Sequence, residues 1–217
     1  MIILTLLAAL VLFVIAAAVP SLLPSGSPVW LPQVITKLVM LLEAFALMLA
    51  SRRPLAEFGF RRGEGRSKRA IAAAFALGAA TTIFVLASGL EGLRGVMKGY
   101  TFLQVVLGVW IVSSVVEEIF VRGWLQTTIA RQGASPRAEV LISGAVFGSL
   151  HLSLLRAGID IASVATIVTA TFLLGLICAA LRQRTKSLIA PTLAHIGFNI
   201  GGMFGGVVFV IVSKLTS

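Results

Sequence analysis

Hydrophobic residues in this chain form long blocks, and the polar residues are gathered into short segments between them. The blocks cover residues 1–19, 29–50, 70–90, 102–129, 140–155, 161–181, 188–200 and 207–212. The first block has 19 residues, and a helix that rises about 1.5 Å per residue over this length nearly crosses a hydrocarbon core of about 30 Å. The pattern therefore predicts an all-α fold, a polytopic bundle of transmembrane helices.

The predicted number of spans depends on the glycine-rich end of the chain. Gly201-Gly202 and Gly205-Gly206 interrupt the apolar sequence between residues 188 and 212. Glycines inside a membrane segment indicate either close packing of two helices or a break in one of them. We therefore expect seven or eight spans.

Composition supports a membrane protein and excludes a soluble domain. Of the 217 residues, 58% are hydrophobic and 12% are charged, and the mean hydropathy is +1.04. Soluble domains contain roughly 25% charged residues, so a soluble fold of this size could not cover its apolar side chains. The net charge of +10 is carried mainly by short loops without interleaved aromatic residues. This favours contact with lipid headgroups over binding of nucleic acid.

The basic residues also predict an orientation, because cytoplasmic loops of membrane proteins are enriched in Lys and Arg. One set of alternate loops is basic: 52–69, which has seven basic residues, 131–137 and 182–186. The opposite set contains zero, two and one basic residues in turn: 20–28, 91–98 and 156–160. We therefore expect a multi-pass protein of the cell (plasma or inner) membrane with a cytoplasmic N-terminus.

Three ionisable residues lie inside the fourth block: Glu117, Glu118 and Arg122. Charged groups in hydrocarbon are usually paired and usually functional. Glu118 and Arg122 are four residues apart, so they share a helical face and can form an ion pair. Glu117 is rotated by about 100° from Glu118, so we expect it to face elsewhere and to be available for another role.

Two later blocks place polar residues at a similar depth. From the expected cytoplasmic edge, Glu117 lies roughly 18 Å deep and His151 roughly 17 Å deep. His195 and Asn199 lie roughly 11 and 17 Å deep. We therefore expect three spans to contribute to one shared site.

The residue types at this depth allow two kinds of chemistry. One carboxylate, two imidazoles and an amide can activate a water molecule and stabilise an oxyanion. Glu117, His151 and His195 could equally hold a catalytic divalent metal with an open position for water. Each group also has a structural interpretation, since a buried ion pair or an interhelical histidine hydrogen bond can serve packing alone.

Other residues inside the blocks are expected to be structural. Lys37 should extend its ammonium group toward the membrane surface, and Glu43 has no predicted partner. Phe147 and the single cysteine, Cys178, should pack in the interior. One cysteine also excludes an intrachain disulfide and a thiolate metal cluster.

Three motifs occur in order on hydrophobic blocks: Glu117-Glu118-x-x-x-Arg122, Phe147-x-x-x-His151 and His195-x-x-x-Asn199. Their order and their position in membrane segments resemble the CPBP family of intramembrane proteases. This family includes the type II CAAX prenyl endopeptidases and bacterial proteins named for bacteriocin self-immunity or abortive infection (Abi). The motifs span residues 117–199.

The resemblance implies a hydrolase that cuts peptide bonds within or near the bilayer. Glu117 with His151 would bind and activate the attacking water, and His195 with Asn199 would stabilise the oxyanion. A metal such as zinc, if present, would be held by Glu117, His151 and His195, and either mechanism is compatible with this set.

The same resemblance suggests how the chain is organised. Residues 1–217 would form a single membrane domain, with two N-terminal spans and a basic cytoplasmic loop over 1–69 and a catalytic core over 70–217. Within that core, Glu118 and Arg122 would hold the site together.

The leading hypothesis is an intramembrane endopeptidase that acts on a membrane-associated protein or peptide. Two other classes are weighed against it. A non-catalytic membrane scaffold or immunity factor would keep the fold but would have little reason to bury Glu117. A proton-coupled transporter could use Glu117 or Glu118 as a relay, but the short chain without repeated halves disfavours it. Nothing in the sequence identifies a prenyl pocket.

Overall fold

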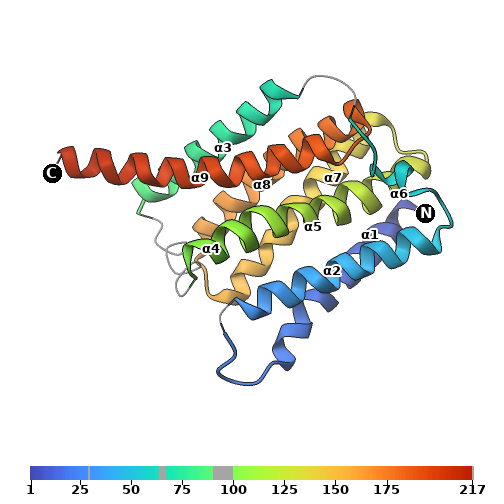
Figure 1. Ribbon diagram of the computed structural model, residues 1–217, viewed down its shortest axis with the longest axis horizontal. Helices are drawn as coiled ribbons and strands as arrows, with labels where there is room; N and C mark the ends of the chain where they lie inside the picture. Colours follow the sequence, from blue (N-terminus) through green and yellow to red (C-terminus); the bar gives the residue numbers. More distant parts are fainter. Residues whose placement is uncertain (29, 64–66, 90–99, 217) are drawn as a thin grey trace.

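The computed structural model describes residues 1–28, 30–63, 67–89 and 100–216. This part of the chain contains helices and no strands. Seven of its helical segments are long and apolar enough to cross a membrane, which confirms the predicted all-α, multi-pass architecture (Figure 1). The predicted loop residues Glu91, Arg94 and Lys98 lie outside the described residues.

The helices follow one another with short connections. The α-helices are α1 (Ile2–Ala18), α2 (Leu31–Ala50), α3 (Lys68–Ala87), α4 (Phe102–Gln104), α5 (Ser114–Glu118), α6 (Gln126–Arg131), α7 (Pro136–Leu150), α8 (Ile161–Thr185) and α9 (Ile189–Thr216). The 3-10 helices are η1 (Val19–Leu22), η2 (Leu55–Phe58) and η6 (His151–Ala157). Two π-helices, η4 (Val105–Ser113) and η5 (Ile119–Leu125), join α4, α5 and α6 into one fourth span.

The glycine-rich end is helical, so the described residues contain seven spans. Helix α9 runs without a break over Ile189–Thr216. A Cβ atom at Gly201 would lie 2.0 Å from the carbonyl oxygen of Phe75 on α3, and one at Gly78 would lie 2.0 Å from that of Phe198. Because glycine lacks this atom, the backbones of α3 and α9 can touch.

The fourth span, Phe102–Arg131, contains both glutamates and is irregular. Its α-helical turn Ser114–Glu118 lies between the two π-helices, and π-helical turns are often found at functional sites. All residues from 116 to 126 are buried, whereas none from 102 to 112 is buried. Glu117 therefore lies where the span passes from its exposed half into its enclosed half.

Helix α7 begins and ends earlier than the predicted block 140–155. It begins at Pro136, because the hydroxyl of Ser135 caps its first turn by accepting a hydrogen bond from the Ala138 amide at 3.2 Å. It ends at Leu150, and the chain continues as the 3-10 helix η6. His151 therefore lies at a helix end rather than within a continuous helix.

Helix α2 packs on the fourth span in parallel and in register (Figure 1). Gln33 Nε2 donates to Ser113 Oγ at 3.2 Å, and Lys37 Nζ forms an ion pair with Glu117. Both pairs are 80 residues apart in sequence. We call this contact the α2 seam, and these four residues form its polar half.

The other half of the α2 seam is apolar. Met40, Ala44 and Met48 repeat at helical spacing on α2, and each is 0% exposed. The Met48 methyl group lies 2.8 Å from the position that a Cβ atom of Gly123 would occupy. The seam is therefore tightly packed on one side of Glu117 and polar on the other.

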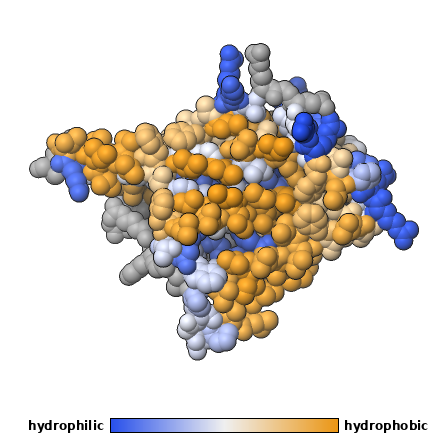
Figure 2. Space-filling view, viewed as in Figure 1, coloured by the Kyte–Doolittle hydropathy of each residue, from blue (hydrophilic) through white to orange (hydrophobic). Residues whose placement is uncertain are grey.

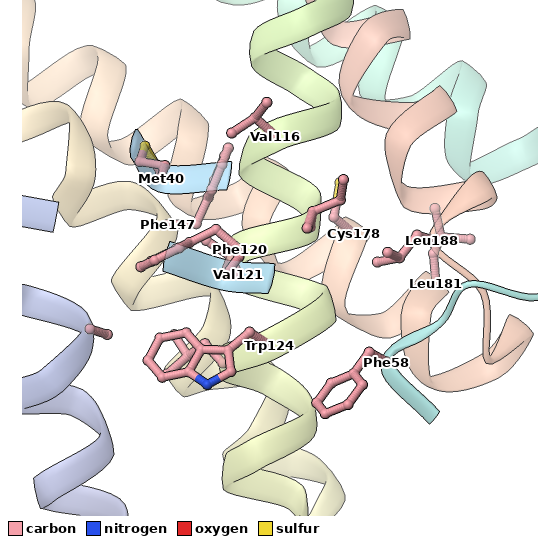
Figure 3. Packing of buried hydrophobic residues seen from close by; sticks show 14 of the residues in the cluster. Met40, Phe58, Val116, Phe120, Val121, Trp124, Phe147, Cys178, Leu181 and Leu188 are labelled. Atoms are coloured by element: carbon pink, nitrogen blue, oxygen red, sulfur yellow. The ribbon is translucent and has the colours of Figure 1, made fainter. Parts of the chain in front are cut away.

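The outer surface of the bundle is largely hydrophobic, and hydrophilic residues gather at the ends of the helices (Figure 2). A strip of hydrophilic residues is also visible between the ridges of α2 and α5 in Figure 2. In the core, Met40 and Phe147 lie to one side of the fourth span and Cys178 and Leu188 to the other (Figure 3). The fourth span is thus the central element of the bundle.

The segment after α2 ties the beginning of α9 to the fourth span. Gly59 has a left-handed backbone conformation with φ of 98°, and its carbonyl oxygen accepts a hydrogen bond from the Leu188 amide at 3.0 Å. Phe58 is buried, and the Arg131 guanidinium carbon lies 4.9 Å from the centre of its ring. These contacts fix where α9 begins, and therefore the height at which α9 presents its polar residues.

Candidate active site

Glu118 and Arg122 form the predicted ion pair, and both side chains are fully buried. Arg122 Nη1 donates to Glu118 Oε1 at 3.0 Å, and Nη2 donates to the carbonyl oxygen of Gly175 on α8, also at 3.0 Å. A buried charge pair is tolerated when its members are also hydrogen-bonded. The pair therefore joins the fourth span to α8 beside the other polar groups.

His195, on α9, lies between the two glutamates. Its Nδ1 is 3.1 Å from Glu118 Oε1, and its Nε2 is 3.8 Å from Glu117 Oε2. Both ring nitrogens thus face a carboxylate oxygen. The shorter contact fixes the ring, and the longer one exceeds a direct hydrogen bond. Glu118 therefore orients His195 toward Glu117.

Phe147, on α7, packs against three of the polar groups. Its ring meets those of His151 and His195 edge-on, with centroid distances of 5.6 and 5.2 Å. The guanidinium carbon of Arg122 lies 4.4 Å from its centroid. Such contacts hold ring orientations and attract a cation to the aromatic face. Phe147 therefore packs in the interior as predicted, and its neighbours there are polar residues of the site.

The hydrogen bond of His151 defines its tautomer. Its Nδ1 lies 3.2 Å from the carbonyl oxygen of Phe147. A carbonyl oxygen only accepts hydrogen bonds, so Nδ1 must carry a hydrogen, and in the neutral ring Nε2 then bears a lone pair. His151 can therefore accept a proton at Nε2.

Asn199 lies one turn after His195 on α9 and reaches back to the fourth span. Its Nδ2 donates to Ser114 Oγ at 3.0 Å, and Ser114 in turn donates to the carbonyl oxygen of Trp110 at 2.6 Å. Ser114 is 0% exposed. Asn199 is therefore anchored to the fourth span at Ser114, which lies three residues before Glu117. No motif in the sequence points to Ser114.

The structure corrects the expectation for Lys37. Its ammonium group does not extend to the membrane surface but crosses from α2 to Glu117 on the fourth span. Glu117 is therefore not unpartnered, as its rotation from Glu118 suggested. It is bonded to Lys37 through Oε1 and faces His195 with Oε2.

The predicted residues of three spans do come together. Glu117 forms an ion pair with Lys37 and faces His195. The ring of Phe147 contacts both His195 and His151, and Asn199 reaches the fourth span through Ser114. Sequence reasoning missed Lys37 and Ser114. The sequence did contain one indication for Lys37. Gln33 and Lys37 on α2 are four residues apart, as are Ser113 and Glu117 on the fourth span.

The donor set predicted for a metal does not fit one in this arrangement. Among the described residues, no group of three or more His, Cys, Asp or Glu side chains is placed to hold a metal ion. The ammonium group of Lys37 also occupies Oε1 of Glu117, where it opposes a second cation. We therefore derive no step through a metal.

Two further residues behave as predicted. Cys178 is buried, and its thiol lies 3.5 Å from the carbonyl oxygen of Pro191. Glu43 has a buried Oε2 without a hydrogen-bond partner among the described residues.

Comparison with known proteins adds one match. Residues 99–201 match the family model described as type II CAAX prenyl endopeptidase Rce1-like. The matched segment includes all three sequence motifs. The chain matched no curated protein and no solved structure. Over residues 99–201, just under half of its length, the chain is therefore similar to the Rce1-like type II CAAX prenyl endopeptidases, in agreement with its resemblance to the CPBP family.

Proposed function

We propose that the protein is an intramembrane endopeptidase that hydrolyses a peptide bond of a membrane-associated protein or peptide. The observation that carries this proposal is the position of His195, which Glu118 holds in the enclosed part of the bundle so that its other nitrogen faces Glu117. A carboxylate and an oriented imidazole at this depth are the parts that water activation and oxyanion stabilisation need.

Water is activated by Glu117 and His151. Glu117 accepts a proton at Oε2, since Oε1 is bonded to Lys37, and His151 accepts one at Nε2, since Nδ1 is bonded to Phe147. In the attack, an O–H bond of water breaks and its proton passes to one of these acceptors. The water oxygen bonds to the carbonyl carbon while the π electrons of the C=O bond move to oxygen.

The negative charge that develops on the carbonyl oxygen is stabilised by His195 and Asn199. These residues lie four apart on α9, so their Nε2–H and Nδ2–H donors project from one face. Fixed donors in a site that excludes water stabilise an oxyanion strongly, and removal of one such donor lowers kcat by about 10²–10³-fold. Collapse of the intermediate breaks the C–N bond, and the leaving amine takes up the proton.

Glu118 and Arg122 support this arrangement without touching the substrate. Glu118 Oε1 accepts from Arg122 and faces His195 Nδ1 at the same time. Loss of Arg122 would leave a buried carboxylate with one partner fewer, which is strongly destabilising. We assign this pair to keeping the His195 ring in place.

We place the protein in the cell membrane with its N-terminus in the cytoplasm. The support is the alternation of basic and non-basic loops along the sequence. A fusion reporter attached to the loop that contains Arg52 and Arg53 should report the cytoplasmic side.

The first test uses the purified protein in liposomes. The probe is a peptide with a farnesylated C-terminal CAAX sequence, offered beside the same peptide without the prenyl group. Glu117→Ala and His151→Ala should each abolish cleavage while the protein accumulates normally. The matched control is Glu43→Ala, which removes another glutamate of a span outside the site and should leave the rate unchanged. Retained turnover in both site variants would refute the assignment.

A second test does not depend on the choice of peptide. The membrane proteomes of cells that express the wild type or Glu117→Ala are compared for cleavage products that disappear. The isosteric variant Glu117→Gln should behave like Glu117→Ala, because it keeps the shape and loses the base. If Glu117→Gln preserved every cellular effect of the wild type, the protein would act as a scaffold instead.

A further inference from the structure

Lys37 is an ionisable residue of the site that none of the three motifs contains. It lies on α2, outside the matched residues 99–201. It is six residues after Leu31, so roughly 9 Å along the helix, and its side chain is 15% exposed. An ammonium group inside a span is costly and usually has a function.

We propose that Lys37 is a positioning residue of the active site, which rests on the proposed function above. Its ammonium group holds Oε1 of Glu117. As a result, Oε2 is the oxygen that faces His195 and the attacking water. Lys37 thus determines which oxygen of the carboxylate acts as the base.

The charge of Lys37 also matters during the reaction. In the resting site its counter-charge is the Glu117 carboxylate. When Glu117 takes the proton of water, the carboxyl group becomes neutral and the negative charge appears on the carbonyl oxygen instead. Lys37 therefore compensates the buried charge of Glu117 in the resting site, which keeps the carboxylate available as a base.

The α2 seam explains why Lys37 remains in this position. One turn earlier, Gln33 donates to Ser113, which lies one turn before Glu117. One turn later, Met40 is 0% exposed in the apolar half of the seam. A lysine that served only the interface would point along α2 toward its nearer end. Contacts on both sides instead direct Lys37 across to the fourth span.

The test separates charge from packing with three substitutions. In liposomes with the farnesylated CAAX peptide, Lys37→Met should lower kcat by about 100-fold or more and change KM by less than about threefold. Lys37→Arg, which keeps the charge, should retain activity within about tenfold of the wild type. Lys37→Gln keeps a hydrogen-bond donor but loses the charge, so its kcat should lie between those of Lys37→Met and Lys37→Arg.

The matched control is Gln33→Leu, which changes the same face of α2 one turn away and does not touch Glu117. Its kcat should stay within about threefold of the wild type. If it fell as far as that of Lys37→Met, the seam as a whole would matter and Lys37 would have no special role.

Each outcome decides the question. Wild-type kcat in Lys37→Met, together with an inactive Glu117→Ala, would reduce Lys37 to a structural counter-ion and leave the proposed function intact. An active Glu117→Ala would instead refute the proposed function itself.

If Lys37→Met does not accumulate as folded protein, Lys37→Arg and Lys37→Gln decide, because equal activity in these two would overturn the proposal. If the wild type does not cut the farnesylated peptide, the products that require Glu117 in membranes serve as the readout.

Discussion

The contact between α3 and α9 and the α2 seam join helices in opposite ways. At Gly78 and Gly201 the backbones of α3 and α9 touch, and the contact leaves no space for a Cβ atom. Across the α2 seam the backbones are held apart by side chains, which are polar around Lys37 and apolar around Met48. The first contact can only be rigid, whereas the second can hold chemical groups.

The difference follows from what drives association in a membrane. Lipid tails are as apolar as leucine side chains, so helices associate through close packing and through hydrogen bonds rather than through the hydrophobic effect. The α3–α9 contact relies on close packing of the two backbones. The α2 seam uses both close packing and polar contacts. The site lies at Glu117, where the polar half of the seam meets the apolar half. This comparison predicts which substitutions change stability and which change activity.

The largest effect is expected at Gly201, where any side chain meets the Phe75 carbonyl group. Gly201→Leu should destabilise the protein by about 3 kcal/mol or more, because overpacking against backbone cannot relax. The measurement is denaturant-induced unfolding in mixed micelles. The matched control is Gly206→Ala, whose Cβ atom would lie 3.7 Å from Thr82 in ordinary contact and should change stability by less than about 0.5 kcal/mol. Equal stabilities would contradict the direct contact of the two backbones.

The next effect is expected in the apolar half of the α2 seam. Met48→Ala leaves a cavity in a fully buried position and should cost about 2–3 kcal/mol of stability. The fraction that remains folded should cleave at the wild-type rate, because Met48 lies 11 residues after Lys37 on α2, roughly 16 Å along the helix. Unfolding and cleavage are measured on the same preparation, and a fall in kcat without a loss of stability would show that the two halves of the seam are not separate.

A double substitution sharpens this point. A Cβ atom at Gly123 would approach the Met48 methyl group at 2.8 Å, but its other neighbours lie at 3.5 Å or more. Gly123→Ala should therefore destabilise the wild type by about 1–2 kcal/mol and have little or no further effect in Met48→Ala. A double-mutant cycle measures this coupling, and additive effects would argue against the register of α2 on the fourth span.

The smallest effect is expected in the polar half of the seam away from Glu117. Ser113→Ala removes the acceptor for Gln33 and should cost about 0.6 kcal/mol, the average for an interhelical hydrogen bond in a membrane protein. A loss several times larger in the unfolding measurement would show that polar contacts, rather than packing, hold α2 in place.

The spans and the Glu118–Arg122 pair could be predicted from the sequence because both depend on local spacing. A block of apolar residues of sufficient length has one stable conformation in hydrocarbon, since its backbone groups must be hydrogen-bonded internally. An i,i+4 pair is likewise fixed by helical geometry. Counting residues also placed Glu117, His151 and Asn199 at a similar depth, and His195 roughly 7 Å nearer the membrane edge.

The partner of Lys37 and the path of α9 could not be predicted in this way. Hydropathy does not say which spans are neighbours, so the matching spacing of polar residues on α2 and on the fourth span could not by itself identify the contact between Lys37 and Glu117, 80 residues away. The path of α9 was ambiguous because glycines such as Gly201 and Gly205 weaken a helix in water but allow two helices to approach closely in a membrane. The end of α7 at Leu150 was missed because His151 follows without a glycine or proline to mark it.

The constant offset of 80 residues across the α2 seam limits how the protein can move. If α2 slid by one helical turn, about 5.4 Å, Lys37 would face Ser113, or Gln33 would face Glu117. The first alternative leaves both charges uncompensated, and the second replaces an ion pair with a neutral contact. Only one axial alignment satisfies all four side chains. A piston movement of α2 is therefore strongly disfavoured, and any separation of α2 from the fourth span must be a tilt.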